Sequence, residues 1–411
     1  MKILVAATTL AVATTAGAAS PYTAPGLPST ELVRPLLEKD PAVAAARAGI
    51  EAAEHEARAL SASPYEWTPR VTGQRRRLDS GLRYNEWNVG IERGLRLPAK
   101  ADADRRIGGF IVEAARARYG EALHETALEF MNRWIDWQGA EQALALSERN
   151  LESTRKAMEA VARRVRAGDA SRLEEGLARA ELSEQARLNA EARAAATNAW
   201  LRLSSRFAGA PRRVEALPLP TPPDRDAAFW RQRVLEESDE IKMAVALEQR
   251  ARARAERLRA ERIPDPTVSA FTASEFGGAE RFSGIGVSIP LPGGARSARA
   301  DQALSEGAVS AQEVTLKKLE VEERVMVAFA SAQGATEVLR LAREGAAAMS
   351  ENARLAQRAY ELGEGDLSSL LLARRQAVAA EVNATQAQVA ALKASYALLI
   401  HAHFIWDLDH E

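Results

Sequence analysis

The chain has few residues that could carry out covalent chemistry. It contains no cysteine and only five histidines. Neither a Gly-x-Ser-x-Gly segment nor a His-Glu-x-x-His segment occurs in it. Pro292, Gly293 and Gly294 are not followed by the Lys–Ser/Thr pair of a phosphate-binding loop, and they predict a strand-to-helix turn instead. These residue types therefore indicate neither an enzyme nor a bound cofactor.

Imidazole and carboxylate groups that could hold a metal ion gather at the C-terminus. They belong to His401, His403, Asp407 and His410. Histidines two positions apart point to different sides of a helix, which hinders one shared site. We therefore expect a solvated tail here and predict no metal site.

The composition indicates an exported helical protein. The 55 basic and 56 acidic residues nearly balance, which argues against a nucleic-acid partner. Aromatic residues make up 5% of the chain, and Arg and Glu are interspersed as in long helices and coiled coils. Lys2, the apolar stretch 3–15 and the small residues 16–18 are typical of a secretory signal peptide, so we expect residues 1–18 to be removed.

The sequence repeats its plan once. Leu97–Lys100 recurs as Leu291–Gly294, 194 positions later, and Arg166–Asp169 recurs as Glu361–Glu364, 195 positions later. Two unrelated markers with nearly one offset indicate a tandem duplication. The expected parts after the signal peptide are a first repeat at 19–210, a Pro-rich linker at 211–223 and a second repeat at 224–411.

Hydrophobic periodicity predicts the same order of elements in both repeats. The first repeat is expected to hold a helix at 30–63, strands at 69–78 and 87–97, a long helix at 99–167 and a return helix ending near 207. The second is expected to hold a helix at 224–262, strands at 267–276 and 285–291, a long helix at 295–362 and a return helix ending near 403. The predicted fold class is mainly α with a small β part.

The expected lengths suggest how these elements are arranged. A helix of about seventy residues spans roughly 105 Å. The two shorter helices of a repeat can lie end to end beside it. Four strands cannot close a barrel, so other copies of the chain must pair their edges, and a trimer with twelve strands is the smallest symmetric solution of membrane size. The arginines at 70 and 75–77 would then have to face the lumen or lie above the membrane.

The duplicated helix–hairpin–long helix–turn–helix unit, the turns at Gly168 and Gly363 and the segment Leu97–Lys100 resemble the outer-membrane efflux proteins of the TolC family. The segment Leu97–Lys100 is most similar to the heavy-metal branch, of the CzcC and CusC type. The resemblance implies a homotrimer in outer-membrane lipid, with a twelve-stranded barrel and a helical tunnel that forms an α-barrel in the periplasm. It also implies two partners, a periplasmic adaptor (membrane fusion) protein and an inner-membrane RND transporter.

The same resemblance implies where the tunnel closes. In the family, a carboxylate near the first turn and a tyrosine before the second hold the tip shut, and Glu174 and Tyr360 match these positions. The acidic residues that narrow the lumen are replaced here by Ser369 and Leu372, and Asp366 could supply a carboxylate ring instead. The expected structural residues are the tip turns Gly168, Asp169, Gly363 and Gly365 and the strand-to-helix turns Pro98, Pro292 and Gly293.

Two other classes of protein remain open at this point. A periplasmic coiled-coil adaptor or scaffold would explain the long helices and the export signal, but not a hairpin placed before each long helix. A secreted enzyme is favoured only by the signal peptide. The sequence does not indicate the transported compound, which in such assemblies is expected to be chosen by the pump.

Overall fold

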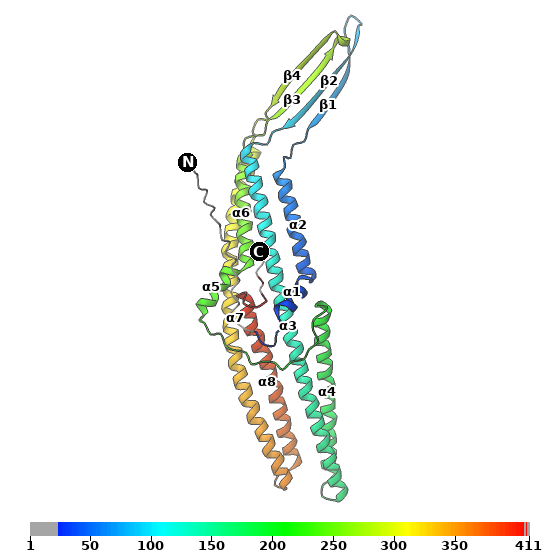
Figure 1. Cartoon of the computed structure of the whole chain (residues 1–411), viewed down its shortest axis with the longest axis vertical. Coiled ribbons are helices and arrows are strands. Elements are labelled where there is room, and N and C mark those ends of the chain that lie inside the picture. The colour runs from blue at the N-terminus through cyan, green and yellow to red at the C-terminus, as the bar shows by residue number, and fades with distance from the viewer. Residues whose placement is uncertain (1–23, 407, 409–411) are drawn as a thin grey trace, which may run out of the picture.

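The computed structural model describes residues 24–406 and 408. The predicted signal peptide at 1–18 lies outside these residues. The described chain forms a long rod with a β-sheet at one end and two helical turns at the other (Figure 1). No helix in the described part of the chain is long and apolar enough to cross a membrane.

The helices and strands follow the predicted order. The first repeat holds α1 (Thr30–Glu38), α2 (Pro41–Ser61), β1 (Thr68–Arg77), β2 (Arg83–Gly94), α3 (Pro98–Ala167) and α4 (Arg172–Arg206). The second holds α5 (Ala227–Glu237), α6 (Asp239–Ala260), β3 (Thr267–Glu275), the 3-10 turn η1 (Phe276–Gly278), β4 (Glu280–Ser288), α7 (Gly294–Leu362) and α8 (Leu367–His401).

Two predicted helices are each broken in two, which corrects the sequence analysis. The helix expected at 30–63 is interrupted before α2, where the Asp40 carboxylate accepts a hydrogen bond from the Ala42 N–H and Pro41 fills the first helical position. The helix expected at 224–262 is interrupted at Ser238, whose hydroxyl accepts from the Ile241 N–H and begins α6. A side-chain N-cap explains both breaks.

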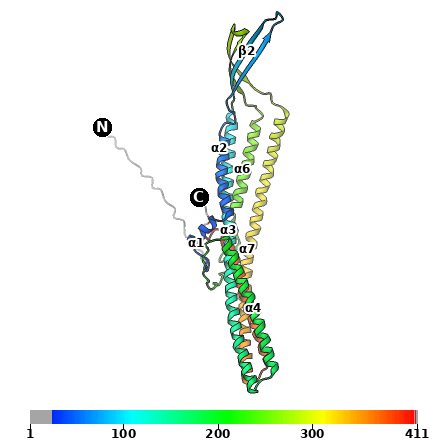
Figure 2. The ribbon, with the colours of Figure 1, turned by 90° about the vertical axis from the view of Figure 1, so that its right-hand side faces the viewer.

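The short helices lie along the long ones as the lengths predicted. α2 packs against the sheet-proximal part of α3 and α4 against its distal part, while α6 and α8 follow α7 in the same way (Figures 1 and 2). α3 also contacts α6 and α8, which joins the two repeats along the rod.

The four strands form one antiparallel sheet in the order β1-β2-β3-β4. β2 pairs with β3, so the hairpins of the two repeats are hydrogen-bonded to each other. The outer edges of β1 and β4 have no partner strand in the described part of the chain.

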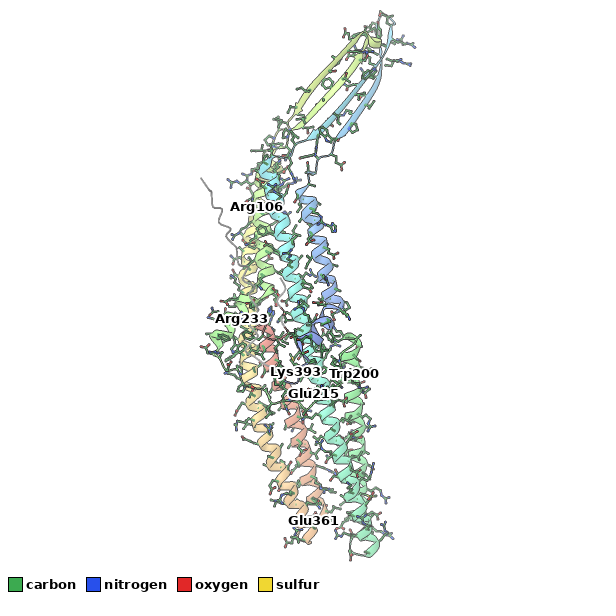
Figure 3. All side chains as sticks on the ribbon, in the orientation of Figure 1. Arg106, Trp200, Glu215, Arg233, Glu361 and Lys393 are labelled. Carbon is green, nitrogen blue, oxygen red and sulfur yellow. The ribbon has the colours of Figure 1, made fainter. Side chains whose placement is uncertain are left out.

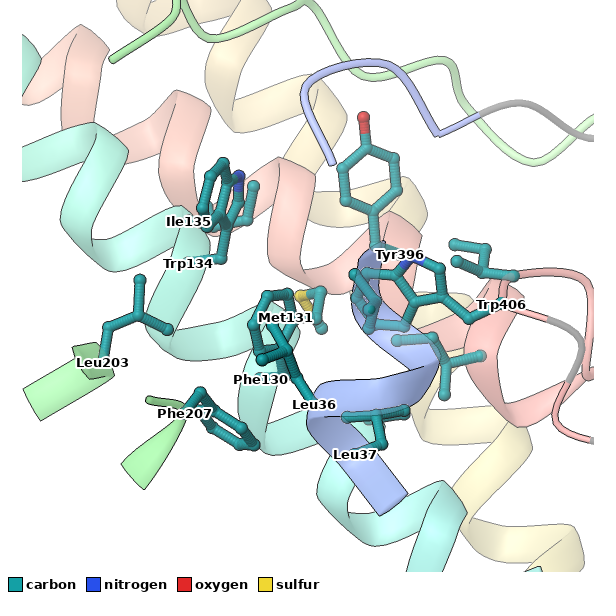
Figure 4. Packing of buried hydrophobic residues seen from close by; sticks show 14 of the residues in the cluster. Leu36, Leu37, Phe130, Met131, Trp134, Ile135, Leu203, Phe207, Tyr396 and Trp406 are labelled. Carbon is teal, nitrogen blue, oxygen red and sulfur yellow. The ribbon is translucent and has the colours of Figure 1, made fainter. Parts of the chain in front are cut away.

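The main hydrophobic core lies in the middle of the rod, where α1, α3, α4 and α8 meet (Figure 4). Phe130 packs edge-on against Trp406, with ring centroids 5.5 Å apart. The indole of Trp134 and the phenol of Tyr396 donate hydrogen bonds to backbone carbonyls in the segment 24–28. The aromatic side chains thus bury their rings while their polar atoms hold the start of the described chain.

Candidate functional site

The register of the sheet separates its side chains into two faces of opposite character. Side chains alternate along a strand, and residues directly opposite each other on paired strands point to the same side. One row runs Val71–Val89–Thr272–Ser283, and the next runs Thr72–Asn88–Ala273–Phe282. Every second row therefore belongs to the same face.

The face that contains Val71 is apolar and exposed. Its apolar members, with two glycine- or proline-bearing positions of β1, are Pro69, Val71, Gly73, Trp87, Val89, Ile91, Val268, Ala270, Ile285 and Val287, and the polar residues Arg93, Thr272, Ser274, Arg281 and Ser283 share the same face. Ile285 is 90% exposed and Val71 74% exposed, on the two outer strands. A contiguous exposed apolar surface of this kind marks contact with another protein or with a membrane.

The opposite face carries the ion pairs of the sheet. Arg70 donates to Glu92 at 2.9 Å, and Arg76 contacts both Glu86 and Glu275 at 3.0 Å. The ion pairs thus join β1 to β2 and, across β2, β1 to β3 on the polar face.

The remaining arginines of β1 lie beyond the apolar rows. Arg75 pairs with Asn85 and Arg77 with Arg83, nearer the hairpin turn than the last apolar row at Trp87. The arginines of the first strand therefore do not interrupt the row of apolar residues Pro69, Val71 and Gly73 on β1.

A buried ion pair fixes the sheet to the helices. Lys100 is fully buried in α3, and its Nζ lies 2.9 Å from Oδ1 of Asp265, just before β3. The Asp265 carboxylate also accepts hydrogen bonds from the Tyr65 hydroxyl at 2.7 Å and from the Leu97 N–H at 3.0 Å. Sequence reasoning missed Asp265, because nothing in the sequence links it to a lysine 165 positions earlier.

The predicted strand-to-helix turns begin the two long helices. Pro98 is the first residue of α3, and Gly293 precedes α7 with Pro292 just before it. Proline suits this place because a first-turn N–H has no helical partner to lose.

Gly168 and Gly363 end the two long helices in the same way. Both adopt left-handed backbone conformations, with φ of 83° and 77°. The N–H of Gly168 donates to the Val165 carbonyl and that of Asp169 to the Arg164 carbonyl, and the same pair of bonds recurs at Gly363. A side chain at either glycine would be strained.

The two turns lie together at the end of the rod opposite the sheet, as the sequence analysis expected. Glu361, two residues before Gly363, marks this end in Figure 3. A small apolar cluster that includes Val161, Ala178, Leu367 and Leu370 joins the helices of both turns. We call this end the tip.

Tyr360 and Glu174 both lie at the tip, but the phenol has a different partner from the one expected. Its oxygen accepts a hydrogen bond from Arg164 Nη1 at 2.7 Å, and the guanidinium also lies over the ring, 5.2 Å from its centroid. Burial raises the pKa of Tyr360 and Glu174 adds to the rise, which Arg164 opposes. Oε2 of Glu174 is buried and has no hydrogen-bond partner among the described residues.

Of the remaining predicted tip residues, some hold the second turn together and one is exposed in a single chain. Asp366 is the N-cap of α8 and accepts from the Ser369 N–H at 2.9 Å and its hydroxyl at 2.8 Å. These bonds hold the pKa of Asp366 below its usual value. Gly365 packs close to Ala359, and Leu372 is 57% exposed, free to face another copy.

An ion pair between α4 and α8 was also missed by sequence reasoning. The Glu181 side chain is 5% exposed and accepts from Arg375 Nε at 2.6 Å and from Gln185 Nε2 at 2.9 Å. Glu181 and Arg375 lie 194 positions apart, close to the offset of the duplication, which is the one signal that could have suggested the contact.

The predicted absence of a metal site concerned the C-terminal histidines. Asp407 and His410 lie outside the described residues. His401 ends α8, and His403 follows it. In the described part of the chain, no three or more His, Cys, Asp or Glu side chains are already grouped to hold a metal ion.

Comparison with known proteins identifies the family. The sequence pattern described as outer membrane efflux protein matches residues 32–208 and 230–399. The chain is 28% identical over 263 residues to the cobalt-zinc-cadmium resistance protein CzcC of Cupriavidus metallidurans, an alignment that covers 60% of this chain and 61% of CzcC.

Solved channel structures share the fold. The outer-membrane channel OprN superposes with a TM-score of 0.78 at 19% identity, over 95% of both chains. CusC, whose structures concern folding and transmembrane channel formation, gives 0.74 at 17% identity, over 90% of this chain and 92% of its own. These identities establish the fold only.

The family match covers both repeats and includes nearly all of the helices and all four strands. It does not support the adaptor or the secreted enzyme that the sequence had left open. The chain shares its fold with outer-membrane channels of known structure and is similar to CzcC over part of its length, and it belongs to the outer membrane efflux protein family.

Proposed function

We propose that three copies of this chain close their sheets into one twelve-stranded barrel. The observation that carries the proposal is the two-faced sheet with two free edges. Its apolar face suits lipid, and its charged face suits a water-filled lumen. Strands of 9 to 12 residues compare with the roughly 9–11 that a tilted transmembrane strand needs. In this arrangement β4 of one copy pairs with β1 of the next.

Cysteine cross-linking tests this pairing, because the chain has no cysteine of its own. Thr72 on β1 and Phe282 on β4 share one row of the sheet and one face. We expect the variant with Thr72→Cys and Phe282→Cys to give covalent trimers with a short bifunctional thiol reagent. Each single variant serves as the control and should stop at dimers. A protein that is monomeric and soluble without detergent would contradict the barrel.

We further propose that the trimer is a passive exit duct for an RND-type pump, reached through a periplasmic adaptor. Metal ions are the proposed cargo, because the CzcC relative is named for cobalt, zinc and cadmium resistance. The test is growth of a strain that lacks this protein but keeps its pump. Loss of resistance to Co²⁺, Zn²⁺ or Cd²⁺, restored by the wild-type protein, is expected. Loss of resistance to organic compounds alone would place the protein with a different pump.

The proposed organisation of the chain is a signal peptide at 1–18, repeats at 19–210 and 224–411, and a linker at 211–223. The family pattern supports it by matching in two segments, 32–208 and 230–399. Mass measurement of the mature protein tests the cleavage, which should remove about eighteen residues.

We infer that the tip is the gate of this duct and that Tyr360, Glu174 and Arg164 regulate it. The contact of Arg164 with Tyr360 supports including the arginine, which the sequence had not suggested. In planar bilayers, the combination of Tyr360→Phe and Glu174→Ala should raise the conductance, and Arg164→Gln should act in the same direction. Arg163→Gln, on the same exposed turn, is the control.

If the variants form intact trimers with unchanged conductance, the three residues only pack the tip and do not regulate the gate. We would then propose that the exposed Leu372 side chains of the three copies form an apolar ring that closes the pore, because such a ring can close a pore by excluding water. Asp366 is a weaker candidate for a carboxylate ring, since its oxygens already cap α8.

A further inference from the structure

Arginines without acidic partners gather on the apolar face of the sheet, at the end that lies away from the helices (Figure 1). They are exposed residues of β1, β2 and β4, and we call them the rim arginines: Arg75, Arg77, Arg83 and Arg281. Arg75 Nε donates to the Asn85 side chain at 3.3 Å. Neither the rim arginines nor Asp79, in the adjoining turn, forms an ion pair in the described part of the chain.

The charges of the strands are divided unequally between the two faces of the sheet. All of the carboxylates in the strands lie on the polar face, and they belong to Glu86, Glu92, Glu275 and Glu280. Of the charged residues, the apolar face carries only arginines: the rim arginines and, at the other end, Arg93, which donates to the Tyr65 carbonyl. The strands therefore offer no carboxylate that could neutralise the rim arginines on their own face.

Two of the rim arginines lie directly opposite each other. Arg77 of β1 and Arg83 of β2 are partners in the register. Like charges in opposite positions destabilise a pair of strands. The turn that follows does not require them, because it is closed by a backbone hydrogen bond from the Leu78 N–H to the Leu82 carbonyl. An anion bound between the two guanidinium groups would offset their repulsion.

The rim arginines lie at a level that suits a lipid headgroup. Trp87 belongs to the last row with a large apolar side chain, and tryptophan is typical of the boundary between hydrocarbon and headgroups. Arg75 and Arg77 lie beyond this row by about 7 and 14 Å along the strand. At a strand tilt of about 40° these distances become roughly 5 and 10 Å along the barrel axis, in and just above a headgroup layer about 5–8 Å thick. Arg281 lies in the row of Trp87, and its long side chain can extend to the same layer.

We propose that the rim arginines bind the phosphate groups of anionic lipids in the leaflet around the far end of the barrel. A guanidinium group matches phosphate oxygens with paired hydrogen bonds. The apolar rows directly below favour a lipid over a soluble anion, because the acyl chains would cover them. This inference rests on the proposed barrel, in which the apolar face contacts lipid. There β4 lies beside β1 of the next copy, so Arg281 continues the belt of arginines around the barrel.

The test is native mass spectrometry of the trimer purified in an uncharged detergent, which counts the bound lipids. The probes are dioleoylphosphatidic acid and, with the same acyl chains and no net charge, dioleoylphosphatidylcholine. We expect the wild-type trimer to bind phosphatidic acid at least about tenfold more tightly. The variant with Arg75→Gln, Arg77→Gln and Arg83→Gln should lose this preference. Arg70→Gln is the matched control, because Arg70 is on β1 but on the polar face, and it should retain the preference.

Inorganic phosphate distinguishes a lipid site from a site for a free anion, because at the same concentration it should not displace phosphatidic acid. Arg281→Gln, a single change on β4, should also reduce the preference, and it provides the measurement if the triple variant does not assemble. The proposal is overturned if the wild-type trimer shows no preference, if free phosphate displaces the lipid, or if the assembled variants keep the full preference. A monomeric wild-type protein would instead contradict the barrel on which the inference rests.

Discussion

Replacing Lys100 by methionine tests how firmly the sheet is fixed to the rod. The ammonium group is fully buried and lies 2.9 Å from Asp265 and 3.5 Å from Glu261. Methionine keeps a similar length and apolar volume but leaves the buried Asp265 carboxylate without its cation. Because the lysine is on α3 and the aspartate precedes β3, the substitution removes a connection between the two repeats.

The expected loss follows from what remains around Asp265. Removing one member of a buried ion pair costs about 3–5 kcal/mol. Asp265 keeps its hydrogen bonds from Tyr65 and Leu97, so we expect the lower end, about 3 kcal/mol per chain. With an unfolding entropy of about 2.1 cal/mol/K per residue, a chain of 411 residues should lose roughly 3.5 °C in its unfolding midpoint.

The assay is thermal unfolding of the detergent-solubilised protein, followed by circular dichroism. Lys156→Met is the control, because Lys156 is 74% exposed and its ion pair with Glu152 should contribute less than about 1 kcal/mol. Combining Lys100→Met with Asp265→Asn should destabilise less than the sum of the two single changes, since both remove the same pair. An unchanged midpoint for Lys100→Met, or strict additivity in the double variant, would refute the reasoning.

The pH dependence provides a second check on the same pair. Burial works to raise the pKa of Asp265, but its contacts with Lys100, Tyr65 and the Leu97 N–H hold the pKa below the ordinary value of 3.8. A carboxyl group with a lowered pKa in the folded state stabilises the protein above its unfolded pKa and loses this effect as the pH falls through its folded pKa. The difference between wild type and Lys100→Met should therefore be full at neutral pH and shrink below about pH 3.8.

Three further substitutions separate the roles of the tip and the sheet. Gly168→Ala should lower stability by about 1–2 kcal/mol because its φ is 83°, whereas Gly176→Ala inside α4 should be neutral or stabilising, as thermal unfolding will show. Asp366→Ala should lower the stability of the protein by about 0.5–2 kcal/mol in the same assay, because it removes the N-cap of α8. Val89→Arg on the apolar face should cost about 2–4 kcal/mol and reduce the trimer recovered from outer membranes, whereas Asn88→Arg on the polar face should not; equal recovery would contradict the assignment of the faces.

The sequence was sufficient for the elements but not for the contacts between them. The long helices were predicted within a residue or two, because seventy positions without proline or a turn cluster leave few alternatives. The breaks before α2 and α6 were missed although Asp40–Pro41 and Ser238 are recognisable helix starts. There, apolar periodicity continued across the break and outweighed the capping signal.

The side-chain contacts between distant segments could not be predicted in this way. Lys100 with Asp265, Arg375 with Glu181, and His124 with His401 are each brought together by the packing of distant segments. No local pattern encodes such a pair, because each member reads as an ordinary helical or loop residue. The tip illustrates this: the resemblance singled out Tyr360, while its partner Arg164 could be known only from the fold.

The register of the first hairpin decides whether the sheet can face lipid at all. Alternation in β2 and a partner strand at 69–78 were visible in the sequence, but the register between the two strands was not, since the arginines at 70 and 76 mask the pattern of Val71. The turn between the strands sets that pairing: the Leu78 N–H donates to the Leu82 carbonyl, and Gly81 turns the chain with a φ of 85°. A shift of one residue would exchange the two faces of β1 and place Arg70 beside Val89. The two-faced sheet, and with it the proposed barrel, therefore depends on this short turn as much as on the strands it joins.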